Sequence, residues 1–168
     1  MRIAGIVHDS IVDGPGFRYV VFTQGCSFCC EGCHNPETLD PKGGTETPVE
    51  DIIKDLLSNP LTDGLTLSGG EPFEQAADCA SLAAAARDNG LNVWTFTGDT
   101  FEDLLKQATG EPAVQKLLSL TDVLVDGRFI LKQRTLALKW RGSKNQRVLD
   151  MKKSLIAKKG VLYDECEG

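Results

Sequence analysis

The chain has 168 residues, of which 41% are hydrophobic and 25% are charged, an ordinary balance for a globular protein. This length predicts a single domain spanning residues 1–168, with a core of useful size. No apolar run of about 18 residues appears, and the N-terminus lacks the apolar core of a signal peptide. We therefore expect a cytoplasmic protein that has no membrane partner. The net charge of −6 argues against nucleic acid as a general partner.

The first predicted element is a strand at residues 18–25, which is rich in β-branched and aromatic side chains. A loop that contains four of the six cysteines follows it directly. The next element is a helix at residues 47–59, with Thr47 and Glu50 as a capping box. Pro48 is expected at its first helical position.

Short apolar segments then alternate with amphipathic or alanine-rich segments. The predicted order is strand 64–70, helix 74–90, strand 91–98, helix 100–108, helix 112–120, strand 122–127 and strand 145–151. Thr100 with Asp103 is expected to cap the helix at 100–108. This alternation predicts an α/β fold in which right-handed crossovers build a parallel sheet with helices outside. The segment 154–168 is expected to be a loosely constrained tail.

An unusual segment follows each of the first four predicted strands. These segments are the cysteine loop, SGGEP at 68–72, TGDT at 97–100 and DGRF at 126–129. Loops that follow parallel strands gather at one edge of the sheet, and that edge carries the site in α/β folds. We therefore expect the four segments to meet.

The cysteine loop can hold a metal in two registers. Cys26, Cys29, Cys30 and Cys33 form two CxxC pairs, which are typical of a four-thiolate zinc site. However, Cys29 and Cys30 are adjacent, so placing all four sulfurs on one ion would strain the loop. The alternative is a C-x3-C-x2-C triad without Cys29, which suits three corners of an iron–sulfur cube and leaves one iron open. Spacing alone favours iron–sulfur over zinc, and a zinc site of three thiolates plus His34 remains the competing interpretation.

The SGGEP segment adds a second indication. Gly69 and Gly70 allow the backbone to approach a ligand closely, and Glu71 offers an acceptor for an ammonium group. The plainer interpretation is a strand-to-helix turn, with Glu71 near a helix N-terminus. Beside an open iron, the same residues suit an amino acid that binds iron through its amino and carboxylate groups.

At this point the sequence resembles the radical S-adenosylmethionine (SAM) enzymes, through the cysteine triad and the GGE motif at 69–71. DGPGFRYVVFTQGC at 13–26 resembles the start of the glycyl-radical-enzyme activases. The small activases of anaerobic (class III) ribonucleoside-triphosphate reductases are similar at four further stretches, which are CEGCHNPET, VWTFTG, VLVDGRFI and WRGSKNQRVLD. The resemblance covers roughly residues 6–150. It departs from most radical SAM enzymes at Gly32, where those usually carry an aromatic residue.

The resemblance implies a partial (βα) barrel and two cofactors, one [4Fe–4S] cluster and SAM. The metal ligands would be Cys26, Cys30 and Cys33. The residues implied to contact SAM are Gly32 and His34 beside the nucleoside, Ser68, Gly69, Gly70 and Glu71 at the methionine amino group, Thr97 and Gly98 near the ribose, and Asp126 and Gly127 near the adenine or a neighbouring polar contact. Asn145 and Gln146 would close the far wall.

The implied reaction is reductive cleavage of SAM to a 5′-deoxyadenosyl radical, which takes hydrogen from a glycine of the reductase. The implied partners are thus the anaerobic ribonucleotide reductase and an electron donor, flavodoxin or ferredoxin. Ten Lys and Arg against one acid at residues 132–159 suggest a dock for the acidic donor. Two alternatives stay open, an activase of another glycyl radical enzyme such as pyruvate formate-lyase, and a non-catalytic zinc-binding module.

Overall fold

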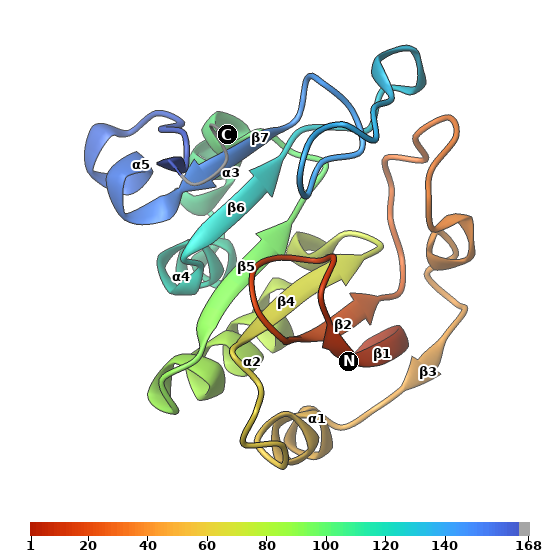
Figure 1. Ribbon diagram of the computed structural model, residues 1–168, viewed down its shortest axis with the longest axis vertical. Coiled ribbons are helices and arrows are strands. Elements are labelled where there is room, and N and C mark those ends of the chain that lie inside the picture. Colours follow the sequence, from red (N-terminus) through yellow and green to blue (C-terminus); the bar gives the residue numbers. More distant parts are fainter. Residues whose placement is uncertain (165–168) are drawn as a thin grey trace.

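The structure is a computed structural model that describes residues 1–164 (Figure 1). Seven strands form one sheet in the order β3-β1-β2-β4-β5-β6-β7. The strands are β1 (Arg2–Ser10), β2 (Arg18–Thr23), β3 (Thr45–Glu46), β4 (Gly64–Gly69), β5 (Asn92–Phe96), β6 (Val123–Asp126) and β7 (Arg147–Asp150). The α-helices are α1 (Val49–Leu56), α2 (Ala76–Asp88), α3 (Phe101–Ala108), α4 (Pro112–Leu120) and α5 (Met151–Ala157). Among the described residues, none of the helices has the length and apolar character needed to cross a bilayer.

The centre of the sheet is parallel, and its edges are antiparallel. Strands β2, β4, β5 and β6 pair in parallel, as the sequence predicted. β1 pairs antiparallel with β2, and β7 pairs antiparallel with β6. The fold is therefore α/β with a mostly parallel mixed sheet, and the expectation of parallel strands throughout was wrong at β7. A parallel connection needs a long crossover, usually a helix, and residues 127–146 contain only a three-residue 3₁₀ turn.

Successive strand residues point to opposite sides of the sheet, and the two sides differ. Leu65 and Leu67 of β4, Val93 of β5 and Leu124 of β6 belong to the large apolar core beneath the helices. Residues at the alternate positions face the other side, where Trp94 and Val125 form a small cluster with Trp140 and Tyr163. In Figure 1 the loop after β1 crosses the front of this second side.

The two predicted helix caps have different outcomes. Thr100 caps α3 as expected, since its hydroxyl accepts a hydrogen bond from Asp103 N at 3.1 Å. The capping box at Thr47 was wrong, because α1 begins one residue later, at Val49, with Pro48 as its N-cap. The Thr47 hydroxyl instead donates to Thr45 O at 3.4 Å.

The segment after α5 contacts the sheet as far as the structure describes it. Asp150 N donates to Val161 O, and Tyr163 N donates to Val148 O, both at 2.9 Å. The Tyr163 ring lies 5.6 Å from the Trp94 ring, edge to face. Cys166 lies outside the described residues.

Candidate functional site

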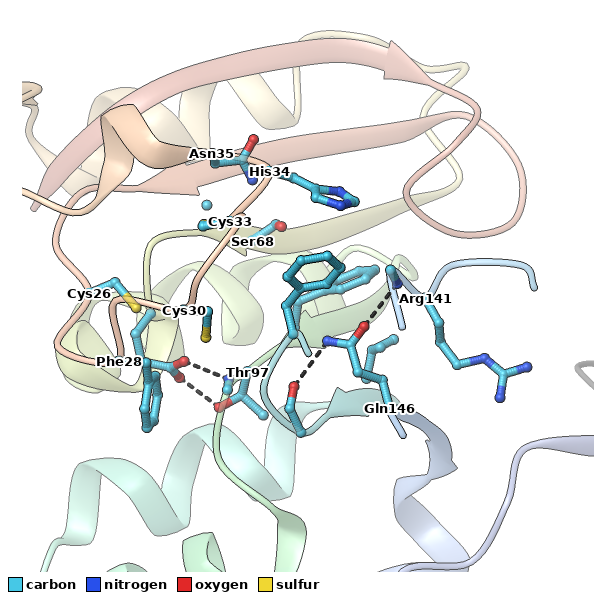
Figure 2. A pocket seen from close by; sticks show the side chains of 18 of the residues that line it. Cys26, Phe28, Cys30, Cys33, His34, Asn35, Ser68, Thr97, Arg141 and Gln146 are labelled. Atoms are coloured by element: carbon cyan, nitrogen blue, oxygen red, sulfur yellow. Dashed lines mark hydrogen bonds between the residues drawn. The ribbon is translucent and has the colours of Figure 1, made fainter. Parts of the chain in front are cut away.

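The cysteine loop begins where β2 ends and curls over the edge of the sheet. Cys26, Cys30 and Cys33 all line one pocket, and Cys29 is absent from its walls (Figure 2). Cys29 is exposed and takes a left-handed backbone conformation with φ of 48°, and its Sγ lies 3.7 Å from Cys26 O. The geometry thus separates three cysteines from the fourth in the C-x3-C-x2-C register.

The three pocket cysteines are the candidate ligands of a metal centre at this edge of the sheet. Among residues 1–164, no three His, Cys, Asp or Glu side chains are arranged to hold one metal ion. Burial raises the pKa of the Cys26 thiol to about 11. A bound cation would lower this pKa again, because a thiol that coordinates a metal is deprotonated.

The glycines that end β4 bring the cysteine loop and the sheet together. Gly70 N donates to Thr23 O at 2.8 Å, and Glu71 N donates to Gly25 O at 2.9 Å. Gly69 has φ of 91°, and a Cβ there would lie 2.7 Å from the Phe22 backbone. A Cβ on Gly70 would overlap Gly25 O. Only glycine permits this contact, so the loop and the strand end are fixed against each other.

Glu71 joins the ends of β4 and β5. Its side chain is 2% exposed, and its carboxylate accepts from Thr97 Oγ1 at 2.7 Å, Gly98 N at 2.8 Å and Phe73 N at 3.3 Å. Burial raises the pKa of this carboxyl to about 7, although the hydrogen bonds oppose the shift. Glu71 lines the pocket, as do Ser68, Gly69 and Gly70, but three donors already occupy its carboxylate.

The ends of β5 and β6 complete the pocket wall, with one exception. Thr97, Gly98 and Gly127 line the pocket, and Asp126 does not. Asp126 points to the helix side, where it accepts from Phe101 N at 2.8 Å and pairs with Arg147 at 2.5 Å. Strand alternation explains this, because Val125 and Gly127 face the pocket and the residue between them faces away.

Of the two residues expected beside the nucleoside, His34 and Gly32, one lines the pocket and the other does not. His34 lines the pocket and packs edge to face on Phe129, with 4.7 Å between ring centroids. Gly32 is not on the pocket wall. It has φ of 71°, and a Cβ there would lie 2.8 Å from Leu131 Cδ1. Gly32 therefore lets the loop pass close to residues beyond β6.

Gln146 lines the pocket at the far wall, as expected, whereas Asn145 does not line the pocket. The Gln146 side chain donates to Gly127 O at 3.0 Å and accepts from Gly142 N at 2.8 Å (Figure 2). Asn145 instead donates to Arg128 O at 2.8 Å. Gln146 thereby fixes the end of β6 to the chain around Gly142.

Several pocket residues were not predicted individually as site residues, although Phe129, Trp140 and Arg141 lie in stretches that the sequence singled out. The pocket has a volume of about 480 Å³, within the range of about 300–1,000 Å³ for ligand sites. Its unpredicted lining residues include Val12, Phe28, Phe129, Leu136, Trp140 and Arg141. The Arg141 Nε is buried and has no hydrogen-bond partner among the described residues. These side chains come from connections whose course depends on tertiary packing. Cys79 is fully buried in α2 and does not line the pocket.

Comparison with known proteins first defines the class. Residues 12–149 match the family model described as a 4Fe-4S single cluster domain. That range contains the cysteine loop and the ends of β4, β5 and β6.

Curated relatives define the family more narrowly. The anaerobic ribonucleoside-triphosphate reductase-activating protein of Vibrio cholerae is 38% identical over 144 residues, which cover 81% of this chain and 89% of the relative. The protein of the same name from Escherichia coli K12 is 34% identical over 146 residues, covering 81% and 90%. The chain belongs to the family of anaerobic ribonucleoside-triphosphate reductase-activating proteins. The pyruvate formate-lyase 1-activating enzyme of Escherichia coli K12 is 32% identical over 134 residues, covering 74% of this chain and 52% of that enzyme.

Proposed function

We propose that this chain is an iron–sulfur, SAM-dependent activase that generates a glycyl radical on an anaerobic ribonucleoside-triphosphate reductase. The observation that carries the proposal is the selection of cysteines. Cys26, Cys30 and Cys33 line one pocket with the ends of three parallel strands, while Cys29 faces solvent. A pocket with three thiolates and room for a ligand suits a cluster that has one open iron.

The three cysteines would hold three irons of one [4Fe–4S] cluster, and the fourth would take the amino and carboxylate groups of SAM. When bound and reduced, the cluster would supply one electron for the cleavage of SAM to methionine and a 5′-deoxyadenosyl radical, and this radical would take a hydrogen atom from the glycine. The work of the protein is to position the reactants and exclude water.

Different parts of the pocket wall would contact different parts of the SAM molecule. Ser68 to Glu71 would receive its amino group, and Thr97 and Gly98 would lie beside the ribose. Gly127 would lie beside the adenine, and His34 on the opposite side. Asp126 and Gly32 would act from behind the wall, by fixing the strand end and the cysteine loop. The sheet would curve as a partial (βα) barrel around this ligand.

The proposed partners are the reductase, through its glycine-bearing segment, and flavodoxin or ferredoxin as the electron donor, all in the cytoplasm. Activation of pyruvate formate-lyase is the second candidate, supported by the 32% identity to its activating enzyme. The reductase ranks first because this chain spans 89% and 90% of the two reductase-activating relatives and only 52% of the pyruvate formate-lyase one.

A matched pair of cysteine substitutions tests the proposal. Cys30→Ala removes a pocket thiol, and Cys29→Ala removes its exposed neighbour. After anaerobic purification we expect Cys29→Ala to keep the brown colour, the iron content and the cleavage of SAM to 5′-deoxyadenosine. Cys30→Ala should lose SAM cleavage entirely. Equal loss in both variants, or a colourless wild-type protein with one zinc per chain, would refute the proposal.

A further inference from the structure

Residues 131–144, here called the basic hairpin, fold back on themselves between β6 and β7. Thr135 N donates to Gly142 O at 3.0 Å, and Lys144 N donates to Gln133 O at 2.9 Å. Gln146 holds the base of the hairpin through Gly142 N. The hairpin is therefore a defined surface of the folded chain.

The charge of the basic hairpin is unbalanced. It contains five of the 18 Lys and Arg of the chain and none of the 24 Asp and Glu. The five are Lys132, Arg134, Lys139, Arg141 and Lys144. Within residues 1–164, none of them forms an ion pair. A cluster of unpaired cations on an acidic protein attracts an acidic partner and steers its approach.

The basic hairpin lies along the mouth of the pocket. Leu136 of the hairpin is 88% exposed and Val12 of the loop after β1 is 72% exposed, and both line the pocket. Ile11, next to Val12, is 71% exposed. The pocket therefore opens between the loop after β1 and the hairpin, and exposed aliphatic side chains stand on both sides of the opening.

We propose that the basic hairpin, with Val12 and Leu136, is the docking surface for the glycine-bearing segment of the reductase, and that its cations bind acidic residues beside that segment. This inference rests on the proposed function. A protein segment that delivers its glycine to the pocket must pass this mouth. Aliphatic and cationic side chains side by side suit a protein partner, whereas single-stranded nucleic acid is bound on aromatic platforms.

The structure divides the basic segment 132–159 that the sequence assigned to the electron donor. The basic hairpin borders the pocket, while Lys152, Lys158 and Lys159 belong to α5 and the turn after it. An electron donor has to approach the cluster without entering the pocket. Ser27 and Cys29 of the cysteine loop are exposed and do not line the pocket. A donor that approaches the loop on this side leaves the mouth of the pocket free for the reductase.

Two triple charge reversals test this surface. The hairpin variant carries Lys132→Glu, Arg134→Glu and Lys144→Glu, three exposed side chains that do not line the pocket. The control variant carries Lys152→Glu, Lys158→Glu and Lys159→Glu, which make the same charge change on exposed side chains. Both are loaded with iron and assayed with SAM, using either dithionite or flavodoxin as reductant. Cleavage of SAM is measured without the reductase, and glycyl radical formation with it.

The hairpin variant should have a KM for the reductase that is roughly tenfold higher or more with either reductant. Added salt should raise the KM of the wild type toward that of the variant, because salt screens exposed charges. Its cleavage of SAM without the reductase and the whole behaviour of the control should match the wild type. An unchanged KM, an equal loss in the control, or a defect seen only with flavodoxin would overturn the assignment; the last result would return the hairpin to the electron donor. A wild type that cleaves no SAM would instead refute the proposed function.

Discussion

The two sides of the central sheet divide stability from chemistry. The side beneath the helices buries one large apolar core that draws on every long strand, including Leu67, Val93 and Leu124. The other side has a smaller aromatic cluster around Trp94, against which Trp140 of the basic hairpin packs, and the loop after β1 crosses this side (Figure 1). Irregular segments thus cover the side that holds the pocket, where a cofactor can bind without displacing the core. Substitutions on the two sides should therefore affect different properties.

The largest expected effect on stability comes from Asp126, whose side chain lies on the helix side. Asp126→Asn should cost about 3 kcal/mol of unfolding free energy, because it removes the buried partner of Arg147. SAM affinity should fall less than it does in Ser68→Ala, because Asp126 does not line the pocket. Urea unfolding and SAM binding measured on the same preparation check both statements.

Ser68→Ala is the matched control on the pocket side. The Ser68 hydroxyl lines the pocket and makes no hydrogen bond to any residue within 1–164. Loss of this hydroxyl should change the unfolding free energy by less than about 0.5 kcal/mol relative to the wild type, and it should weaken SAM binding. If Asp126→Asn weakened SAM binding more than Ser68→Ala, the division between the two sides would be wrong.

Glu71 sharpens the comparison because it links the strand ends at the site. Its pKa is raised to about 7 from an ordinary 4.5, so the folded protein keeps a proton that the unfolded chain releases. Stability should therefore fall as pH rises from about 4.5 to about 7. Relative to Glu71→Gln, the wild type should lose about 2 kcal/mol of unfolding free energy between pH 5 and pH 8. Urea titrations at both values measure this difference, and a gap that does not change with pH would contradict the burial of an ionisable carboxyl.

The smallest expected effect concerns two threonines near helix starts. Thr100→Ala should cost about 1 kcal/mol, because the hydroxyl caps α3. Thr47→Ala should cost less than about 0.5 kcal/mol, because Thr47 caps no helix. Thermal unfolding of the two variants separates them, and equal losses would restore the capping box at Thr47.

The sequence could predict the parallel centre of the sheet and the meeting of its strand ends. Alternating apolar segments set the strands and helices, and parallel pairing then brings the cysteine loop, Gly69 and Gly98 to one edge. Asp126 lies behind the pocket wall, and a strand-end motif does not reveal which of its residues faces the pocket. Alternation along β6 would have placed Asp126 on the helix side, because Val125 faces the pocket and the residue after it faces the other way.

The parts that the sequence missed depend on tertiary contacts. β1 carries no clean alternation and contains Gly5, so its strand conformation depends on pairing with β2. The basic hairpin has no regular strand or long helix, and its position follows from Gln146, Gly142 and the end of β6. Its cationic composition was visible in the sequence, whereas its place at the mouth of the pocket was not.

The most direct test of the central claim is electron paramagnetic resonance on the complete reaction. The iron-loaded protein is mixed anaerobically with SAM, a reductant and an anaerobic ribonucleoside-triphosphate reductase. The account predicts a glycyl radical signal on the reductase, formed together with 5′-deoxyadenosine and absent when Cys30→Ala replaces the wild type. Cleavage of SAM without a radical on the reductase, under conditions where a known activase produces one, would contradict it.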